Sequence, residues 1–131
     1  MASIPDSHRD LLDAEAATMA TIGPDGRPQL TEVWFVPDGD SVAVSINTAT
    51  QKARNLRCNP GCSLLILDPA GPYRYLELRG DAVVTPDDGY ALVDRIDAKY
   101  GSDLRSYDGP NAGRLAVRLH VTRVHAADLR E

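Results

Sequence analysis

The stretch Thr50-Gln51-Lys52-Ala53-Arg54-Asn55-Leu56-Arg57-Cys58-Asn59-Pro60 carries the strongest structural signal in the chain. It follows an apolar run at residues 42–46, whose period of two indicates a β-strand that leaves the core. Thr48 or Thr50 can cap a helix that begins here, and Pro60 ends it within about two turns. A strand followed by a short helix is therefore predicted.

The start of this predicted helix suits an anion. Backbone N–H groups in a first helical turn lack intrahelical acceptors and carry partial positive charge, which favours a phosphate. From charge alone, an ordinary solvated connector is the commoner explanation for such a basic segment. However, Lys52 and Lys99 are the only lysines among 14 basic residues. In so arginine-rich a chain, a lysine in this turn is less expected by chance, and it favours a phosphate site.

The composition indicates one globular domain over residues 1–131. Hydrophobic residues make up 43% and charged residues 25%, and the length allows one core. The net charge of −5 argues against general nucleic-acid binding, which needs a basic face. No apolar run approaches the roughly 20 residues of a membrane span, and the N-terminal residues do not resemble a signal peptide. We therefore expect a cytoplasmic protein without a membrane partner.

Cys58 and Cys62 do not indicate a metal site. They are four residues apart, and the chain has no further cysteine and no CxxC spacing. A disulfide, a metal ligand and simple packing are all open to two cysteines, but free thiols in a reducing compartment are favoured. No metal is predicted.

Turn motifs and apolar alternation divide the chain into predicted strands. Turns rich in glycine, proline and aspartate are expected at residues 23–26, 37–40 and 68–72. The strands are expected at residues 17–22, 28–36, 42–46, 62–67, 73–84 and 114–123. Gly80 is a candidate bulge within the longest of them.

A second, longer helix is expected from a cap at residues 85–88 to about Tyr100, followed by a loop at residues 102–113. In the last strand, His120 falls on the polar face and is expected at the surface. Six or more antiparallel strands with two helices predict a mainly β protein, a barrel with attached helices.

The order of these elements and four local motifs resemble a known family. The motifs are Asp25-Gly26-Arg27-Pro28-Gln29, Val33-Trp34-Phe35, residues 52–60 with Ser63-Leu64-Leu65 after them, and Leu78-Arg79-Gly80-Asp81-Ala82. They resemble the pyridoxamine 5′-phosphate oxidase-like flavoproteins, and within these the group that binds the deazaflavin coenzyme F420. The resemblance implies an FMN-binding-like split β-barrel. The Lys-x-x-Asn-Leu-x-x-Asn-Pro run points to the superfamily and does not by itself name the cofactor.

The resemblance also implies where the phosphate of a cofactor would bind. It would lie at the start of the short helix, beside Thr50, Lys52 and Asn55, with Gln51 in the same turn. Ser45, at the end of the preceding strand, would contribute its hydroxyl. Arg54 points away from Lys52 on a helix, so it would face a diester, the tail of the cofactor or solvent.

The cofactor ring would rest against the second strand. There Thr31, Val33 and Trp34 would contact it, although a core position for Trp34 is about equally expected. Members of the family are typically homodimers with cofactor sites between subunits. Tyr73 and Tyr75 would then approach the site from the partner subunit.

The second strand distinguishes two possible cofactors. Family members that use FMN usually carry an arginine there, aimed at the phosphate. Here Leu30-Thr31-Glu32-Val33-Trp34 contains no basic residue, and Glu32 would repel a phosphate if it pointed inward. This disfavours FMN and favours coenzyme F420.

The leading hypothesis is therefore an oxidoreductase that transfers a hydride between coenzyme F420 and an unsaturated small molecule. The cofactor carries the difficult step in such enzymes, so no catalytic residue is assigned. An FMN-dependent or haem-handling relative is one alternative. A non-enzymatic F420 carrier and a purely structural barrel are the others.

Overall fold

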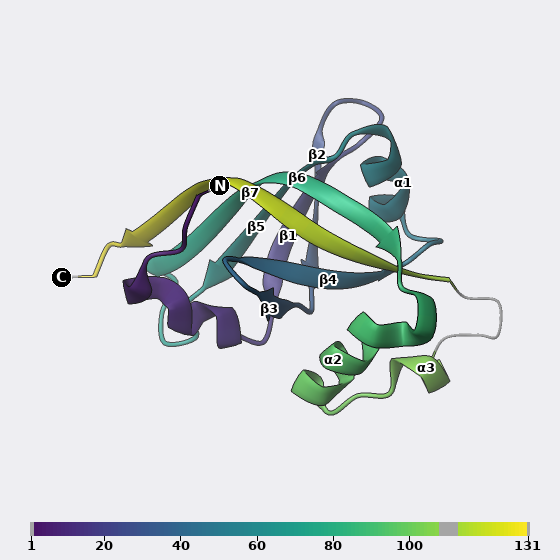
Figure 1. The fold of residues 1–131 in the computed structure, drawn as a ribbon. Helices are drawn as coiled ribbons and strands as arrows, with labels where there is room; N and C mark the ends of the chain where they lie inside the picture. The colour runs from purple at the N-terminus through teal and green to yellow at the C-terminus, as the bar shows by residue number, and fades with distance from the viewer. Residues whose placement is uncertain (1, 108–112, 131) are drawn as a thin grey trace.

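The strands of this protein form one curled antiparallel sheet, shown in Figure 1. The computed structural model describes residues 2–107 and 113–130. Within them the strand order is β2-β1-β5-β6-β7-β4-β3. The strands are β1 (Ala17–Ile22), β2 (Pro28–Val33), β3 (Val36–Asp38), β4 (Ser41–Asn47), β5 (Gly61–Leu67), β6 (Arg74–Pro86) and β7 (Arg114–Asp128).

Helical segments cover the ends and one side of this sheet (Figure 1). They are the 3₁₀ helices η1 (Asp6–Asp13) and η2 (Asp88–Tyr90), and the α-helices α1 (Gln51–Cys58), α2 (Ala91–Tyr100) and α3 (Leu104–Tyr107). Among the described residues, none of these helices has the length and apolar character needed to cross a membrane. The mainly β, split-barrel prediction is confirmed.

Two residues close the sheet into a barrel. β2 and β3 follow each other in the chain but lie at opposite ends of the strand order, joined only by Trp34 and Phe35. So short a connection spans about 10 Å at most, so the two edges of the sheet must come close together. The prediction of one strand over residues 28–36 is wrong, because the chain leaves one edge at Val33 and crosses to the other.

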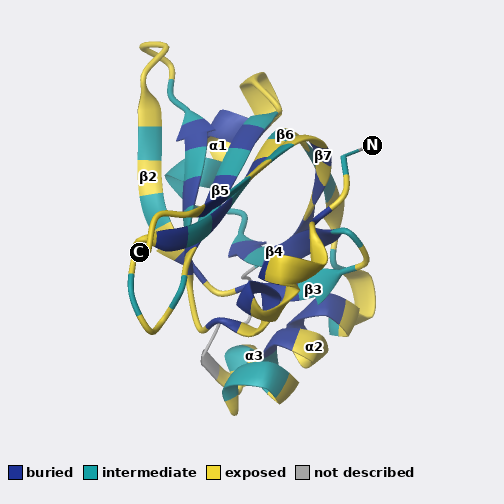
Figure 2. Ribbon diagram, turned by 90° about the vertical axis from the view of Figure 1, so that its left-hand side faces the viewer, coloured by how far each residue is buried: buried dark blue, intermediate teal, exposed yellow. Residues whose placement is uncertain are grey.

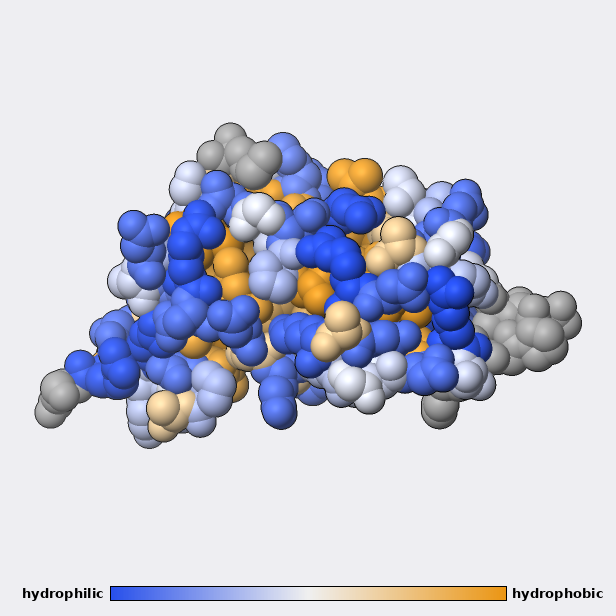
Figure 3. All heavy atoms as spheres, turned by 60° about the horizontal axis from the view of Figure 1, so that its bottom comes forward, coloured by the Kyte–Doolittle hydropathy of each residue, from blue (hydrophilic) through white to orange (hydrophobic). Residues whose placement is uncertain are grey.

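The interior of the barrel is packed with apolar side chains, and Figure 2 shows the buried residues that recur along the strands in dark blue. Phe35, Met19, Ile66 and Leu76 are among its fully buried members. A second cluster lies outside the barrel, where α2 packs on β3, β4 and β7 through Val36, Ala43, Leu92, Ile96 and Ala116. β4 is therefore covered on both faces. On the outer surface hydrophilic side chains dominate, as on the face turned forward in Figure 3.

A bulge at Gly80 bends the long β6–β7 ladder. The register shifts between Arg79 and Gly80, which confirms the predicted bulge. A Cβ atom on Gly80 would lie 1.9 Å from the carbonyl oxygen of His120, so only glycine fits. His120 itself is exposed, as predicted, and β7 runs on to Asp128, beyond the predicted end at residue 123.

The predicted start of the longer helix is wrong by several residues. Thr85 and Pro86 pair with Ala116 and Leu115 in the sheet, so they extend β6. The Asp87 carboxylate then accepts hydrogen bonds from the backbone N–H groups of residues 92 and 93, each 3.0 Å long. Asp87 thus caps α2 from beyond η2. Of the predicted loop at residues 102–113, the structure describes residues 102–107, which include α3, and Gly113, whereas residues 108–112 lie outside the described part.

An ion-paired arginine ties η1 to the sheet. Arg74, 8% exposed, donates to the carboxylates of Asp10 and Asp68 and to the carbonyl oxygen of Ser7. Arg74 holds the pKa of Asp10 below the ordinary aspartate value, and the Ala70 N–H together with Arg74 lowers the pKa of Asp68. The N-terminal segment is therefore fastened to the β5–β6 turn by charge as well as by packing.

Candidate functional site

Thr50 fixes the start of α1. Its hydroxyl accepts a hydrogen bond from the Ala53 N–H at 3.3 Å and donates to the Asn47 carbonyl oxygen at 2.8 Å. This confirms Thr50 as the cap of the predicted helix. Ala53 and Leu56 are buried on the inner side of α1. The first turn of α1 is thereby held at the end of β4, beside a hollow in the surface.

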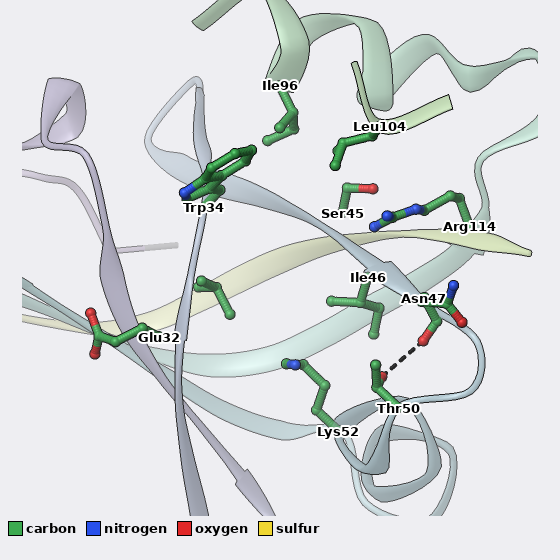
Figure 4. A pocket seen from close by; sticks show the side chains of 11 residues that line it. Glu32, Trp34, Ser45, Ile46, Asn47, Thr50, Lys52, Ile96, Leu104 and Arg114 are labelled. Carbon is green, nitrogen blue, oxygen red and sulfur yellow. Dashed lines mark hydrogen bonds between the residues drawn. The ribbon is translucent and has the colours of Figure 1, made fainter. Parts of the chain in front are cut away.

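This hollow, called here the Lys52 hollow, has a volume of about 330 Å³. Figure 4 shows its lining side chains, with Ser45 and Arg114 on one side and Thr50 and Lys52 on the other. The lining residues are Glu32, Val33, Trp34, Ser45, Ile46, Asn47, Thr50, Lys52, Ile96, Leu104 and Arg114. Its size lies at the lower end of the range typical of small-molecule sites.

Lys52 supplies a cation to this hollow. Its side chain leaves the first turn of α1 and points into the hollow in Figure 4. Burial lowers the pKa of Lys52 from its ordinary value. Within residues 2–107 and 113–130, its ammonium group has neither a hydrogen bond nor an ion pair. A half-buried ammonium that has no partner in the described part of the chain is unfavourable by itself and suits an anionic ligand.

Ser45 supplies a second polar group that lacks a partner. Its Oγ atom is buried and has no hydrogen-bond partner among the described residues. Such an atom typically costs about 1–3 kcal/mol, so native proteins rarely leave one without reason. Because Ser45 lines the Lys52 hollow, a polar ligand group there can satisfy its hydroxyl.

The opposite part of the hollow is apolar. Trp34 is 43% exposed, so it is not a core residue, and its neighbour Val33 is buried. Ile96 and Leu104 lie near Trp34 in Figure 4, and both line the hollow. An apolar wall with an aromatic ring is the surface on which a planar ring system packs well.

Glu32 lies at the rim of the hollow. The Thr18 hydroxyl donates a hydrogen bond to its carboxylate, and Figure 4 shows this carboxylate turned away from Lys52. Because Glu32 does not point inward, it repels a phosphate in this hollow less than its place in the sequence suggests. The absence of a basic side chain on β2 remains.

The structure places the other predicted α1 residues at a second hollow of about 490 Å³, between α1 and the β1–β2 turn. Gln51, Arg54 and Asn55 line it. Asn55 is 3% exposed, and its amide nitrogen donates to Thr21 Oγ1 at 3.0 Å and to Gln29 Oε1 at 3.1 Å. Its amide oxygen accepts from Gln51 at 2.8 Å, so Asn55 is committed to holding α1 on the barrel.

Arg54 is also engaged within its own segment. Its guanidinium donates to Gln51 Oε1 at 2.9 and 3.2 Å and to the Ala49 carbonyl oxygen at 3.0 Å. The structure therefore brings Val33, Trp34, Ser45, Thr50 and Lys52 together and separates Arg54 from them.

Three further predicted residues lie away from the Lys52 hollow. Thr31 shares a face of β2 with Val33 but does not line the hollow. Tyr75 pairs with Ala127 near the end of β7, whereas Arg114, which lines the hollow, begins that strand. Tyr73, just before β6, is 66% exposed. A contribution of either tyrosine from a partner subunit stays a prediction.

Residues that reach the hollow through strand pairing and helix packing were not predictable from the sequence. Arg114 is opposite Asn47 in the β4–β7 ladder, and Ile96 comes from α2. The only local signal at Arg114 was its place at the start of an alternating strand. Its position beside Ser45 depends on which strand pairs with which.

The described residues contain no cluster of three or more histidine, cysteine, aspartate or glutamate side chains that could hold a metal ion. Cys58 is exposed, Cys62 is buried, and both are free thiols. Burial raises the pKa of the Cys62 thiol to about 12, which leaves it protonated and unreactive.

Comparison with known proteins agrees with this architecture. The pyridoxamine 5′-phosphate oxidase family matches the chain over residues 4–128. The chain belongs to this family. A solved structure named as an F420 reductase is 31% identical, with a TM-score of 0.82 over 93% of this chain and 98% of that one.

Two other members of the fold are more distant. A conserved hypothetical protein from Mycobacterium tuberculosis is 25% identical, with a TM-score of 0.78 over 97% of this chain and 86% of that one. The haem storage protein from Vibrio cholerae is 17% identical, with a TM-score of 0.69 over 96% of both chains. At that identity the likeness concerns the fold alone.

Proposed function

We propose that this family member binds coenzyme F420 in the Lys52 hollow and transfers a hydride between the cofactor and an unsaturated small molecule. The observation that carries the proposal is that one hollow combines polar groups without partners among the described residues and an apolar wall. Lys52 and Ser45 provide the former, and Trp34 is part of the latter. A 31% identical structure named as an F420 reductase supports it.

The residues fit the two ends of such a cofactor. Lys52 and the free N–H groups at the start of α1 would hold a phosphate, and the Ser45 hydroxyl would donate to one of its oxygens. Val33 and Trp34 would pack against the ring system, and Ile96 and Leu104 would exclude water from it. When bound, the deazaflavin supplies the hydride chemistry, and these residues supply binding and orientation.

Two alternatives are less well supported by the same residues. Haem iron normally needs an axial histidine, cysteine, methionine or tyrosine, and the described lining of the Lys52 hollow contains none of these. FMN would find no basic side chain on β2.

A carrier that binds F420 without turnover differs from the enzyme only in having no electron acceptor.

A homodimer forms part of the proposal. Tyr73 and Leu129 expose 66% and 65% of their surface and are linked by a 2.8 Å backbone hydrogen bond. Two exposed apolar side chains at one end of the sheet suit a contact with a second copy. Light scattering should give twice the mass of the chain, and replacement of both residues by serine should shift it towards the monomer.

A fluorescence titration tests the cofactor. Purified protein is titrated with coenzyme F420, FMN and haem at the same ionic strength. Saturable binding of F420 with weaker binding of the other two supports the proposal. A preference for FMN would refute the choice of cofactor, and binding of none would refute the site. With F420 bound, a panel of quinones and enones then separates an enzyme from a carrier.

A further inference from the structure

A smaller hollow of about 270 Å³ adjoins the Lys52 hollow. It is lined by Trp34, Ser102, Asp103 and Leu104, and we call it the Asp103 hollow. Trp34 and Leu104 line both hollows, so one aromatic ring and one aliphatic side chain stand between them. A molecule in the Asp103 hollow would therefore lie next to whatever fills the Lys52 hollow.

We propose that the Asp103 hollow binds the small-molecule substrate and selects neutral or cationic apolar molecules over anions. This inference rests on the proposed function, because it takes the neighbouring hollow as the cofactor site. The apolar part of the recognition comes from Trp34 and Leu104. The charge selection comes from the Asp103 carboxylate at the rim.

The Trp34 wall is held firmly. Its ring stacks on that of Tyr100, with centroids 4.4 Å apart and planes 5° from parallel. Tyr100 belongs to the last turn of α2, so one face of the indole is covered by the protein itself. A fixed aromatic surface loses little entropy when a flat molecule packs on it.

The Asp103 charge is fixed as well. Its carboxylate accepts a 2.7 Å hydrogen bond from the Ser106 hydroxyl and a 3.3 Å bond from the Ser106 N–H. These bonds lower the pKa of Asp103, so it is ionised at neutral pH. The nearby cation of Arg105 is paired with Asp94 at 3.0 Å. An anion beside Asp103 would meet a negative charge that this arginine neutralises only in part.

The two hollows thus carry opposite charge. The Lys52 hollow contains the Lys52 ammonium, which has no partner among the described residues, and its one described acid, Glu32, turns its carboxylate away from Lys52 in Figure 4. The Asp103 hollow contains one acid and no cation among its lining residues in the described part of the chain. This difference would direct an anionic cofactor to one hollow and keep it out of the other.

A neutral quinone and an anionic quinone of similar shape test the inference. Protein that carries Lys52→Ala, so that the neighbouring hollow has lost its lysine, is titrated without cofactor with 1,4-naphthoquinone and with its anionic 2-sulfonate, and quenching of Trp34, the single tryptophan, is followed. The measured quantity is the ratio of the sulfonate Kd to the neutral Kd. In Asp103→Asn this ratio should fall about fivefold, because the carboxylate charge is lost. Asparagine keeps the capping geometry, so α3 should be preserved.

The outcomes are distinct. In this Lys52→Ala background, a ratio that Asp103→Asn leaves unchanged, tighter binding of the sulfonate than of the neutral quinone, or no saturable quenching would each overturn the inference. In the natural protein, binding in the Lys52 hollow would favour the sulfonate, because Lys52 is a cation. Ser106→Ala keeps the charge of Asp103 and should leave the ratio within about twofold of that of the Lys52→Ala protein.

A parallel titration with F420 separates this inference from the proposed function. Asp103→Asn should leave the F420 Kd unchanged, since Asp103 does not line the Lys52 hollow. If F420 fails to bind the natural protein while the quinone ratio still responds to Asp103, the cofactor assignment fails and the Asp103 hollow stands as a binding site. If F420 binds and the ratio does not respond, only the present inference fails.

Discussion

The ring of Trp34 lies flat on the ring of Tyr100, 4.4 Å away. The Tyr100 hydroxyl also contacts the backbone of Phe35, 3.1 Å from its nitrogen and 3.2 Å from its oxygen. Lys99 adds hydrogen bonds to the carbonyl oxygens of Phe35 and Ala14 at 2.8 and 2.7 Å. The last turn of α2 therefore holds both residues that carry the chain from β2 to β3.

Substitutions at Tyr100 should separate the stack from the hydroxyl. Tyr100→Phe removes only the contacts to Phe35 and should lower the free energy of unfolding by about 1 kcal/mol. Tyr100→Leu also removes the stack and should cost about 1 kcal/mol more. Urea unfolding measures both. The emission of Trp34 should shift to the red in Tyr100→Leu alone, and equal spectra in the two variants would contradict the positioning role.

Lys52→Ala should weaken F420 binding by about 1.5–3 kcal/mol through loss of a charge-assisted contact. The free energy of unfolding should stay nearly constant, because the ammonium has no partner among the described residues. Fluorescence titration and urea unfolding check the two parts. Arg57→Ala, an exposed cation on the same helix, is the matched control. Equal losses in both variants would mean that only the overall charge matters.

Ser45→Ala should leave the unliganded protein as stable as before, or slightly more so. The substitution removes a buried hydroxyl that has no partner in the described part of the chain. It should weaken F420 binding by about 1 kcal/mol if the hydroxyl meets the phosphate. Ser41→Ala is the control on the same strand, because Ser41 donates to the Leu119 carbonyl oxygen. That variant should be destabilised and should bind normally once folded.

Gly80→Ala should lower the free energy of unfolding by more than about 3 kcal/mol. The new methyl group would overlap the backbone of His120, which cannot move without disturbing the β6–β7 ladder. Gly71→Ala, in the turn before β6, meets nothing within 4 Å and should change stability by less than about 0.5 kcal/mol. Thermal unfolding of both variants measures the two losses, and similar melting temperatures for Gly80→Ala and Gly71→Ala would contradict the close contact at the bulge.

Arg74→Met should make the protein less stable at neutral pH and less sensitive to acid. Arg74 depresses the pKa of Asp10 and Asp68 in the folded protein. Their contribution is therefore present above the ordinary aspartate pKa and is lost as the pH falls through the lower folded values. The melting temperatures of the natural protein and the variant should converge as the pH falls below about 4. Arg79→Met, which removes an exposed pair with Glu77, should show no such convergence.

Local features of the fold were predictable from sequence. The Thr50 cap, the strand leading to it and the bulge at Gly80 depend on a few neighbouring residues, and all three were confirmed. The break at Trp34 was not predictable, because the apolar run from Val33 to Val36 continues across it and only the curl of the whole sheet requires the crossing. The cap by Asp87 was missed for a related reason, since β7 draws Thr85 and Pro86 into the sheet.

The residues of the candidate site likewise divide into those that depend on local sequence and those that depend on strand pairing. Lys52 and Ser45 could be picked out because they flank one strand–helix junction. Arg114 could not, because it depends on the pairing of β4 with β7, and the residues between them number more than sixty. Asn55 is the converse case. Its neighbours in sequence suggest a ligand, while its partners Thr21 and Gln29 come from other strands.

The crossing at Trp34 and Phe35 has a mechanical consequence. The two residues are the seam of the barrel, and one of them is also a wall of both hollows. Any fluctuation that separates β2 from β3 at these two residues must therefore open both hollows. A molecule bound against Trp34 should suppress such a fluctuation. We expect ligand binding to slow hydrogen exchange first at β3, the three-residue strand that the seam holds in place.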